Sequence, residues 1–277
     1  MRSGLLALPM VVIAALTARS THANPLTFAA RSSITPEVSS NWSGYALVAP
    51  IDGTPVAFTD VTGTWVAPKA RCIDGRRDAS AFWVGLGGYS VSSTSLQQLG
   101  TAAECSGGTG AKPVYYAWWE VVPASSVRIP LTISPGDTIT AAVLVKGQTI
   151  TFSLQDVTRR TRFSKVITTG QTLDVGSAEW IAEAPSNCFI GKCKTVPLTN
   201  FGTVTFTKAA AIGNAHPGTI TEGTWSASPI ELVSNGSGGG LFLGSDTLGP
   251  GVGAVPGDVS SDGRSFSVSW QQNVPSS

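Results

Sequence analysis

The chain has 277 residues, with 18 lysines and arginines against 17 aspartates and glutamates, so its formal net charge is +1. A protein that binds nucleic acid through phosphate contacts needs a strongly basic surface, and this balance does not provide one. Hydrophobic residues make up 42% and charged residues 13% of the chain, which excludes a disordered chain and a coiled coil.

The first 23 residues have the pattern of a secretory signal peptide. Arg2 gives a positive start, an apolar run extends from Leu5 to Leu16, and Ala23 ends a small-residue cleavage site. The run is shorter than the roughly 20 apolar residues of a membrane span. We therefore expect a secreted, extracellular protein whose mature form begins near Asn24 and is not bound to a membrane.

The rest of the chain is expected to fold as one β-rich domain. Residues 24–38 look like a lead-in or short propeptide, and from residue 39 to 277 short stretches of period-two alternation follow one another, separated by turn signals. The clearest stretches are 58–66, 115–122, 138–145, 149–154, 178–182, 203–207 and 265–270. The pattern predicts an all-β fold, a β-sandwich of two packed antiparallel sheets.

The four cysteines are predicted to be structural, because export permits disulfides. Cys188 and Cys193 are five residues apart and flanked by turn residues, so we expect them to close a small loop. That leaves Cys72 to pair with Cys105. Four cysteines allow three connectivities, of which this one is favoured. Neither pair has the spacing of a metal site, and we expect no metal and no cofactor.

The scarcity of histidine limits the chemistry that the chain can perform. His22 lies in the signal segment, so His216, in a predicted surface turn, is the single histidine of the mature chain. No Gly-x-Ser-x-Gly motif accompanies it, which disfavours a Ser-His-Asp hydrolase. A zinc site with two or three histidines is excluded, and carboxylates remain as candidates for acid–base chemistry.

Three glutamates stand among aromatic or aliphatic residues of predicted strands, Glu120, Glu179 and Glu183. Glu179 and Glu183 share one face of a strand, because alternate residues point the same way. They lie about 13 Å apart along it, too far for a glycosidase pair, whose carboxyls are within about 9.5 Å of each other. A pair of Glu120 and Glu183 from neighbouring strands stays open. Many glutamates on sheets are simply solvated, so the pattern alone assigns no role.

Seven short segments carry a resemblance to a known family. They read Ser-Asn-Trp-Ser-Gly (40–44), Phe-Trp-Val-Gly-Leu (82–86), Leu-Gln-Gln-Leu-Gly (96–100), Tyr-Ala-Trp-Trp-Glu (116–120), Ile-Ser-Pro-Gly-Asp (133–137), Ala-Glu-Trp-Ile-Ala-Glu (178–183) and Phe-Gly-Thr-Val-Thr-Phe (201–206). In this order they resemble the glutamic peptidases (eqolisins, peptidase family G1). These are secreted acid endopeptidases that resist pepstatin, so the resemblance implies polypeptide substrates and a concanavalin A-like β-sandwich.

The resemblance also implies roles for individual residues. Gln98 and Glu183 match the catalytic dyad, in which a glutamate moves protons, an amide holds the water and the oxyanion, and water attacks directly. Such a reaction needs neither histidine nor metal. Trp83, Trp118 and Glu120 match positions that line the substrate cleft. Trp42 is a further candidate for the cleft, and core packing is the alternative for these tryptophans, because tryptophan is heavily buried on average.

Two features of the sequence leave alternatives open. Gln97 would be the catalytic amide if the register were shifted by one residue, since neighbouring strand residues face opposite sides. Gly87 stands where the family usually has an aspartate, which favours, as an alternative, a non-catalytic carbohydrate- or protein-binding β-sandwich. A glycosidase using Glu120 and Glu183 is a third hypothesis. We expect a monomer.

Overall fold

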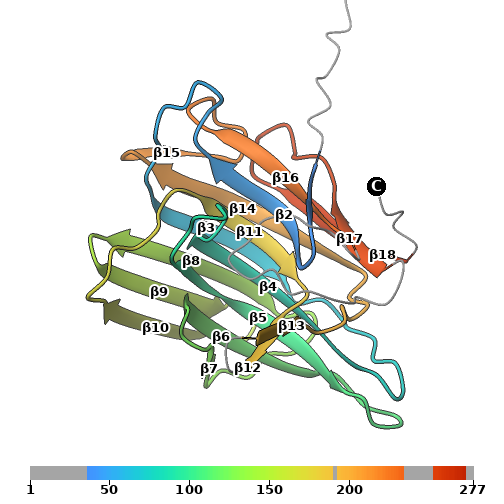
Figure 1. Ribbon diagram of the computed structural model, residues 1–277. Coiled ribbons are helices and arrows are strands. Elements are labelled where there is room, and N and C mark those ends of the chain that lie inside the picture. Colours follow the sequence, from blue (N-terminus) through green and yellow to red (C-terminus); the bar gives the residue numbers. More distant parts are fainter. Residues whose placement is uncertain (1–35, 190–191, 234–251, 273–277) are drawn as a thin grey trace, which may run out of the picture. The chain divides into compact units, whose positions relative to one another are not determined.

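All regular structure is β in the part of the chain that the computed structural model describes, residues 36–189, 192–233 and 252–272, with the backbone alone at 188–189 and 192–193 (Figure 1). No helix occurs there, so none that could span a membrane does either. The all-β prediction is confirmed. The strands are β1 (Glu37–Ser39), β2 (Trp42–Val48), β3 (Phe58–Val66), β4 (Arg77–Gly87), β5 (Leu96–Ser106), β6 (Val114–Val122), β7 (Val127–Ile129), β8 (Thr138–Lys146), β9 (Thr149–Asp156), β10 (Thr161–Thr168), β11 (Ala178–Glu183), β12 (Ser186–Phe189), β13 (Lys192–Thr195), β14 (Thr203–Gly213), β15 (His216–Gly218), β16 (Ser226–Leu232), β17 (Val252–Pro256) and β18 (Phe266–Gln272).

The strands differ in how many of their faces are buried. Strands β8 and β9 alternate between buried and less buried positions, because one face meets the core and the other meets solvent. Strands β4 and β5 are buried along almost their whole length. Both of their faces are therefore covered, and the second face carries the candidate site described below.

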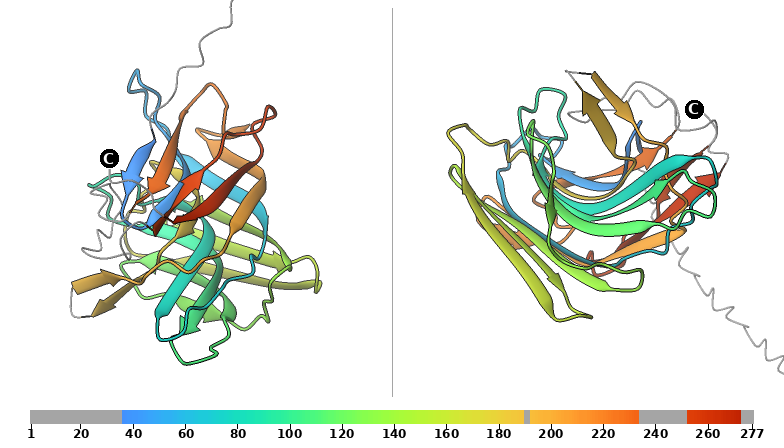
Figure 2. Two further views of the ribbon diagram at one scale, coloured as in Figure 1. Left: turned by 90° about the vertical axis from the view of Figure 1, so that its right-hand side faces the viewer. Right: turned by 90° about the horizontal axis from the view of Figure 1, so that it is seen from below.

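Backbone pairing joins the strands into one continuous sheet, where the sequence pattern predicted two. Its order is β10-β9-β8-β3-β14-β18-β17-β16-β2-β11-β4-β5-β6-β7, with β15 beside β14 and a separate β12–β13 hairpin. Neighbours are antiparallel, except that β1 pairs parallel with β16. The sheet reaches back over itself, so that β4 and β5 contact β3 and β8 (Figure 2).

The two halves of the folded sheet share a main core that is tied together by buried indole groups. Trp65 of β3 donates a hydrogen bond from Nε1 to Oγ1 of Thr101 on β5 at 3.0 Å. Trp180 of β11 donates from Nε1 to the main-chain oxygen of Thr62 on β3 at 2.8 Å. These bonds satisfy polar atoms that would otherwise be buried without partners, so they fix how the halves face each other.

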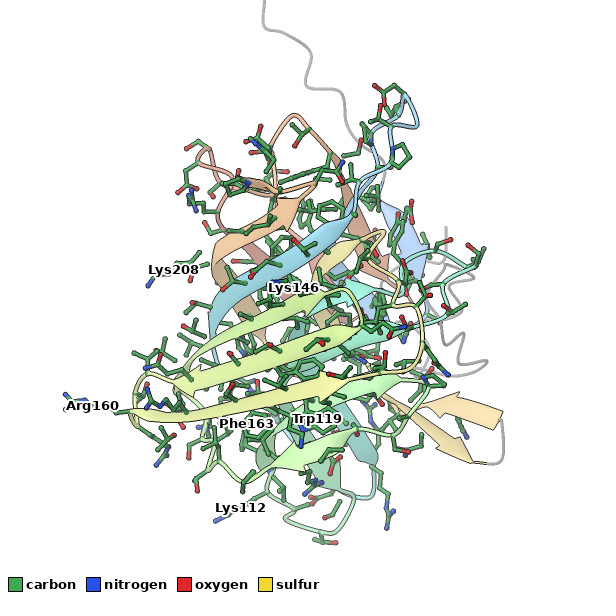
Figure 3. All side chains as sticks on the ribbon, turned by 90° about the vertical axis from the view of Figure 1, so that its left-hand side faces the viewer. Lys112, Trp119, Lys146, Arg160, Phe163 and Lys208 are labelled. Carbon is green, nitrogen blue, oxygen red and sulfur yellow. A yellow bond between two sulfur atoms is a disulfide. The ribbon has the colours of Figure 1, made fainter. Side chains whose placement is uncertain are left out.

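The far ends of the strand order also meet at this core. Trp119 of β6 and Phe163 of β10, both labelled in Figure 3, pack against the main core cluster. Trp119 stacks on Phe152 of β9 with ring centroids 5.5 Å apart. The edge strands β7 and β10 thus belong to neighbouring parts of one core rather than to separate bodies.

A second hydrophobic cluster lies on the other face of β4 and β5. Its fully buried or nearly buried members are Trp42, Ala46, Ala81, Trp83, Leu96, Ala102, Trp118, Val122, Ile181 and Ile230. They come from β2, β4, β5, β6, β11 and β16. Because the two clusters lie on opposite faces of the same strands, residues that alternate in sequence are divided between them.

The cysteine pairing follows the prediction where the structure describes it. Cys72 and Cys105 form a disulfide that ties the connection before β4 to the end of β5. Cys188 and Cys193 face each other in the backbone register of the β12–β13 hairpin. Their side chains lie outside the described residues, so this second disulfide stays a prediction.

The described chain begins within the predicted lead-in. Glu37 and Val38 of that segment already pair with β16 as part of β1. Residues 1–35, with the predicted signal peptide and most of the lead-in, lie outside the described part of the chain, and so does the glycine-rich segment 236–240. The predicted boundaries of processing remain predictions.

Replacing Thr101 by valine should destabilise the fold, because it leaves the buried N–H of Trp65 without an acceptor. We expect a loss of about 1–3 kcal/mol in the free energy of unfolding, measured by denaturant titration. Thr205→Val is the matched control, since Thr205 is exposed and bonds only Ser267 among the described side chains. Equal effects of the two substitutions would contradict the role given to the Trp65–Thr101 bond.

Candidate active site

A cavity of about 310 Å³ opens on the second face of β4 and β5. Of the six residues expected at the site, five line it: Trp42, Gln98, Trp118, Glu120 and Glu183. The other lining residues are Asn41, Ala81, Leu96, Ala102, Tyr116, the loop 123–126 and residues 185–187. The structure therefore brings together both predicted catalytic residues, which lie 85 positions apart in the sequence.

The register of four neighbouring strands explains how these side chains meet. Gln98 of β5 lies opposite Gly85 of β4 on one side and opposite Glu120 of β6 on the other. Glu183 of β11 lies opposite Ala81 of β4. Since Ala81 and Gly85 are four residues apart on one strand, they share a face. Gln98, Glu120 and Glu183 therefore project to the same side.

Glu183 has a hydrogen-bond donor on each of its carboxyl oxygens. Trp83 donates from Nε1 to Oε2 at 2.7 Å, and Asn41 donates from Nδ2 to Oε1 at 3.2 Å. Burial, together with the nearby charge of Glu120, raises the pKa of Glu183 to about 8, although the indole groups of Trp83 and Trp42 and the amide of Asn41 act in the opposite direction. At acid pH this carboxyl therefore keeps its proton in the unliganded protein.

Gln98 and Glu120 form a second hydrogen-bonded unit in the cavity. Gln98 donates from Nε2 to Oε2 of Glu120 at 2.7 Å. The amide oxygen of Gln98 is buried and has no hydrogen-bond partner among the described residues. Burial raises the pKa of Glu120 to about 7. The amide is thus held by its nitrogen, and its oxygen is available to a group that enters the cavity.

Trp83, which was expected to line the substrate cleft, lies behind the cavity wall. Its side chain is 0% exposed and is not part of the cavity lining. It packs edge-on against Trp42, with ring centroids 5.0 Å apart, and reaches Glu183 with its indole nitrogen. A Cβ on Gly85 would lie 2.8 Å from Cζ3 of Trp83, so the missing side chain at position 85 is what leaves room for this ring.

The structure also separates Gln98 from its neighbour. Gln97 is fully buried and does not line the cavity. Its amide lies 2.8 Å from Oγ of Ser95 and close to the main-chain oxygens of Leu86 and Asp174. The register therefore directs Gln98, not Gln97, into the cavity.

The backbone conformation at position 87 requires glycine, so more than the loss of a carboxylate distinguishes this position. Its φ is +77°, and a Cβ there would lie 2.5 Å from the main-chain oxygen of Asp174. The Asp174 carboxylate accepts hydrogen bonds from the N–H of Gly88 and from the hydroxyl of Ser93. A carboxylate is thus present next to this turn, supplied by the connection between β10 and β11.

Sequence reasoning missed several residues of the cavity. Asn41 was named only within the Ser-Asn-Trp-Ser-Gly segment, and Tyr116 only within the aromatic segment 116–120. No cluster of three or more histidine, cysteine, aspartate or glutamate side chains with the arrangement of a metal site occurs in the described parts of the chain.

Glu179 shares the face of Glu183 but is buried and does not line the cavity. It is 0% exposed, and burial, with the charge of Asp174, raises its pKa well above the ordinary value despite the nearby Ser177 hydroxyl. A carboxyl in this position keeps its proton to a higher pH in the folded protein than in the unfolded chain. Its contribution to stability therefore depends on pH.

Stability should fall as the pH rises above about 4.5. Above that value unfolded chains lose the proton that the folded state keeps on Glu179, so the free energy of unfolding falls by up to about 1.4 kcal/mol per pH unit for this group. Glu120 and Glu183 act in the same direction. Glu179→Gln should give a shallower slope in denaturant titrations between pH 4 and 7, and Thr205→Val, which changes no titratable group, should keep the native slope. A native slope in Glu179→Gln would contradict this account.

Comparisons with known proteins agree with the fold. The model of the Peptidase A4 family matches residues 40–238. Scytalido-glutamic peptidase, solved with a peptide-based transition-state analog, is 24% identical, with 83% of this chain and 98% of that chain covered and a TM-score of 0.63. SCP-B, an eqolisin solved with the tripeptide Ala-Ile-His, is 23% identical, with the same coverage and a TM-score of 0.59.

A third solved structure, aspergilloglutamic peptidase from Aspergillus niger, is 22% identical, with 70% of this chain and 99% of that chain covered and a TM-score of 0.50. No curated protein matches the chain in a sequence search. These likenesses show a shared fold, and the family match covers more than half of the sequence. The chain therefore belongs to the Peptidase A4 family, the glutamic peptidases of family G1.

Proposed function

We propose that the chain is a secreted, extracellular glutamic endopeptidase that hydrolyses polypeptides at acid pH, with Glu183 and Gln98 as its catalytic dyad. The observation that supports this most is that both side chains line one cavity, from strands β11 and β5 on either side of β4. Family membership supports a peptidase. The signal-peptide pattern of residues 1–23 supports secretion.

In this proposal Glu183 moves the protons of the reaction. Its pKa of about 8 means that it enters the reaction as a neutral carboxyl. One oxygen delivers its proton to the carbonyl oxygen of the substrate while the other takes a proton from the attacking water. The water oxygen bonds to the carbonyl carbon, and a neutral tetrahedral intermediate with two hydroxyl groups forms.

Glu183 also transfers the protons when the tetrahedral intermediate breaks down. Glu183 gives its proton to the leaving nitrogen and takes one from a hydroxyl of the intermediate, while the C–N bond breaks. The products are a carboxylic acid and an amine, and Glu183 ends in its starting state. No covalent bond to the protein forms, and the reaction needs no metal or cofactor.

Gln98 holds the water and the developing charge. Its amide oxygen, which has no partner among the described residues, accepts a hydrogen bond from the water. Its Nε2 carries two protons, of which one is donated to Glu120. The second is available to the oxygen that was the substrate carbonyl. Glu120 therefore orients the amide of Gln98, in addition to its predicted contact with substrate.

The remaining features of the proposal follow from the cavity and the fold. Trp42, Trp118 and Tyr116 give it aromatic walls that suit an extended peptide. We infer that the two layers of the folded sheet correspond to the concanavalin A-like sandwich of the family, and that the protein acts as a monomer and resists pepstatin.

Activity should decline as the pH rises through about 7 to 8, where Glu120 and Glu183 lose their protons. The reason is that the first step needs the proton of Glu183, and an ionised carboxyl cannot supply it. The measurement is kcat/KM for a peptide substrate across pH 2–9, at pH values where circular dichroism shows the protein folded. Activity that rises through this range would contradict the proposed proton donor.

Removing either member of the dyad should abolish most of the activity. With an unfolded protein as substrate, at acid pH and with pepstatin present, we expect kcat of Glu183→Gln to fall by about 10²–10⁴. For Gln98→Ala we expect a fall of about 10²–10³. Matched controls are Glu222→Gln and Gln155→Ala, which change surface residues outside the cavity lining.

Other results would favour the alternative hypotheses. Glu120 and Glu183 both line the cavity, so release of reducing sugar from a glycan, with Gln98→Ala still active, would identify a glycosidase. A folded native protein that cleaves nothing across the acid range, even after removal of the lead-in, would favour a non-catalytic binding protein.

A further inference from the structure

Asn41 makes a contact with Glu183 that none of the predicted roles includes. It lies just before β2, is 4% exposed, and donates from Nδ2 to Oε1 of Glu183 at 3.2 Å. Trp83 occupies the other carboxyl oxygen, Oε2. Each oxygen of Glu183 thus meets one donor from a buried side chain.

The hydroxyl of Ser39 fixes which way the Asn41 amide points. Ser39 Oγ accepts hydrogen bonds from the backbone N–H groups of Asn41 and Trp42 at 3.3 and 3.1 Å. Its single proton is then donated to Oδ1 of Asn41, also at 3.3 Å. With its oxygen engaged in this way, the amide presents its nitrogen, the donor end, to Glu183.

The backbone holds the two segments in fixed register. The N–H of Ala184 donates to the main-chain oxygen of Asn41 at 2.8 Å. Trp42 and Glu183 are directly opposite in the β2–β11 pairing. Asn41 therefore cannot move away from Glu183 without breaking the end of this ladder.

Two donors, one on each carboxyl oxygen, fix the orientation of the Glu183 carboxyl, which one donor alone cannot do. The last torsion of a glutamate side chain is broad, so a single hydrogen bond from Trp83 leaves the plane of the carboxyl free to turn about that oxygen. A second donor from another direction fixes the plane. It also opposes burial and the charge of Glu120 on β6, the two influences that favour the protonated form.

We propose that Asn41, oriented by Ser39, is the positioning residue of Glu183 and sets the plane of its carboxyl for proton exchange with water and substrate. This inference rests on the proposed function for its catalytic meaning. The contact itself also explains why Asn41, although it begins an Asn-Trp-Ser glycosylation pattern, is enclosed with its amide already engaged.

The test compares Asn41→Ala, Asn41→Asp and the control Asn200→Ala. Asn200 lies outside the cavity lining, and its amide oxygen accepts a hydrogen bond from the backbone N–H of Gly202. For Asn41→Ala we expect kcat to fall at least about tenfold with KM within about threefold. The titration midpoint of the Glu183 carboxyl, followed by carbon-13 NMR and assigned with Glu183→Gln, should rise by about one pH unit. Asn200→Ala should change none of these.

Asn41→Asp separates positioning from simple packing, because it keeps the shape of the side chain. The introduced carboxyl can donate to Glu183 only while it is protonated. We expect activity close to native at the acid end of the profile and an early loss as the pH rises. A profile parallel to the native one would overturn the proposal.

The outcomes for Asn41 and for the dyad can be told apart. If folded Asn41→Ala keeps the native kcat, pH profile and Glu183 titration, the positioning role is wrong while the peptidase stands. If native protein is inactive or Glu183→Gln is fully active, the proposed function fails. If, in addition, Asn41→Ala leaves the titration midpoint of Glu183 unshifted, the inferred effect of Asn41 on Glu183 is wrong as well. Should Asn41→Ala fail to fold, Ser39→Ala must give a smaller shift in the same direction, and no shift would overturn the proposal.

Discussion

A carboxyl group that is taken out of water must keep its proton or meet hydrogen-bond donors, because an isolated buried charge is too unfavourable to persist. The second face of β4 and β5 imposes this constraint on Glu120, Glu179 and Glu183, all of which have raised pKa values. Glu183 meets two donors and Glu120 meets the amide of Gln98. Such groups favour the folded state at acid pH, and the proposed reaction uses the same protonated form of Glu183.

Small residues on the same face create the space in which this chemistry can take place. Ala81 and Ala102 lie side by side between Glu183 and Tyr116 in the cross-strand register. Gly85, two rows further along the same face, admits the ring of Trp83. The cavity and the placement of its carboxyl therefore arise from the same alternation of large and small side chains along two long strands. The geometry of the proposed dyad is set by the sheet, because both residues lie on strands.

Much of the fold and of the candidate site could be predicted from the sequence, but only where the information is local or carried by motifs. Alternation along residues 138–154 correctly predicts β8 and β9, whereas the one-sheet pairing depends on contacts distant in sequence. The motifs directed attention to Gln98 and Glu183, yet the choice between Gln98 and Gln97 needed the register. Trp83 was expected to touch substrate, because burial cannot be read from a tryptophan alone. Asn41 carried no signal beyond its motif.

The central claim is that Glu183 and Gln98 act on the same tetrahedral centre, and a structure with a bound peptide-based transition-state analog tests it most directly. We predict that the oxygens of the tetrahedral centre lie within hydrogen-bonding distance of both the Glu183 carboxyl and the Gln98 amide, with Asn41 and Trp83 still on Glu183. An analog whose tetrahedral centre contacts Glu120 and Glu183 but not Gln98, or that binds outside this cavity, would contradict the account.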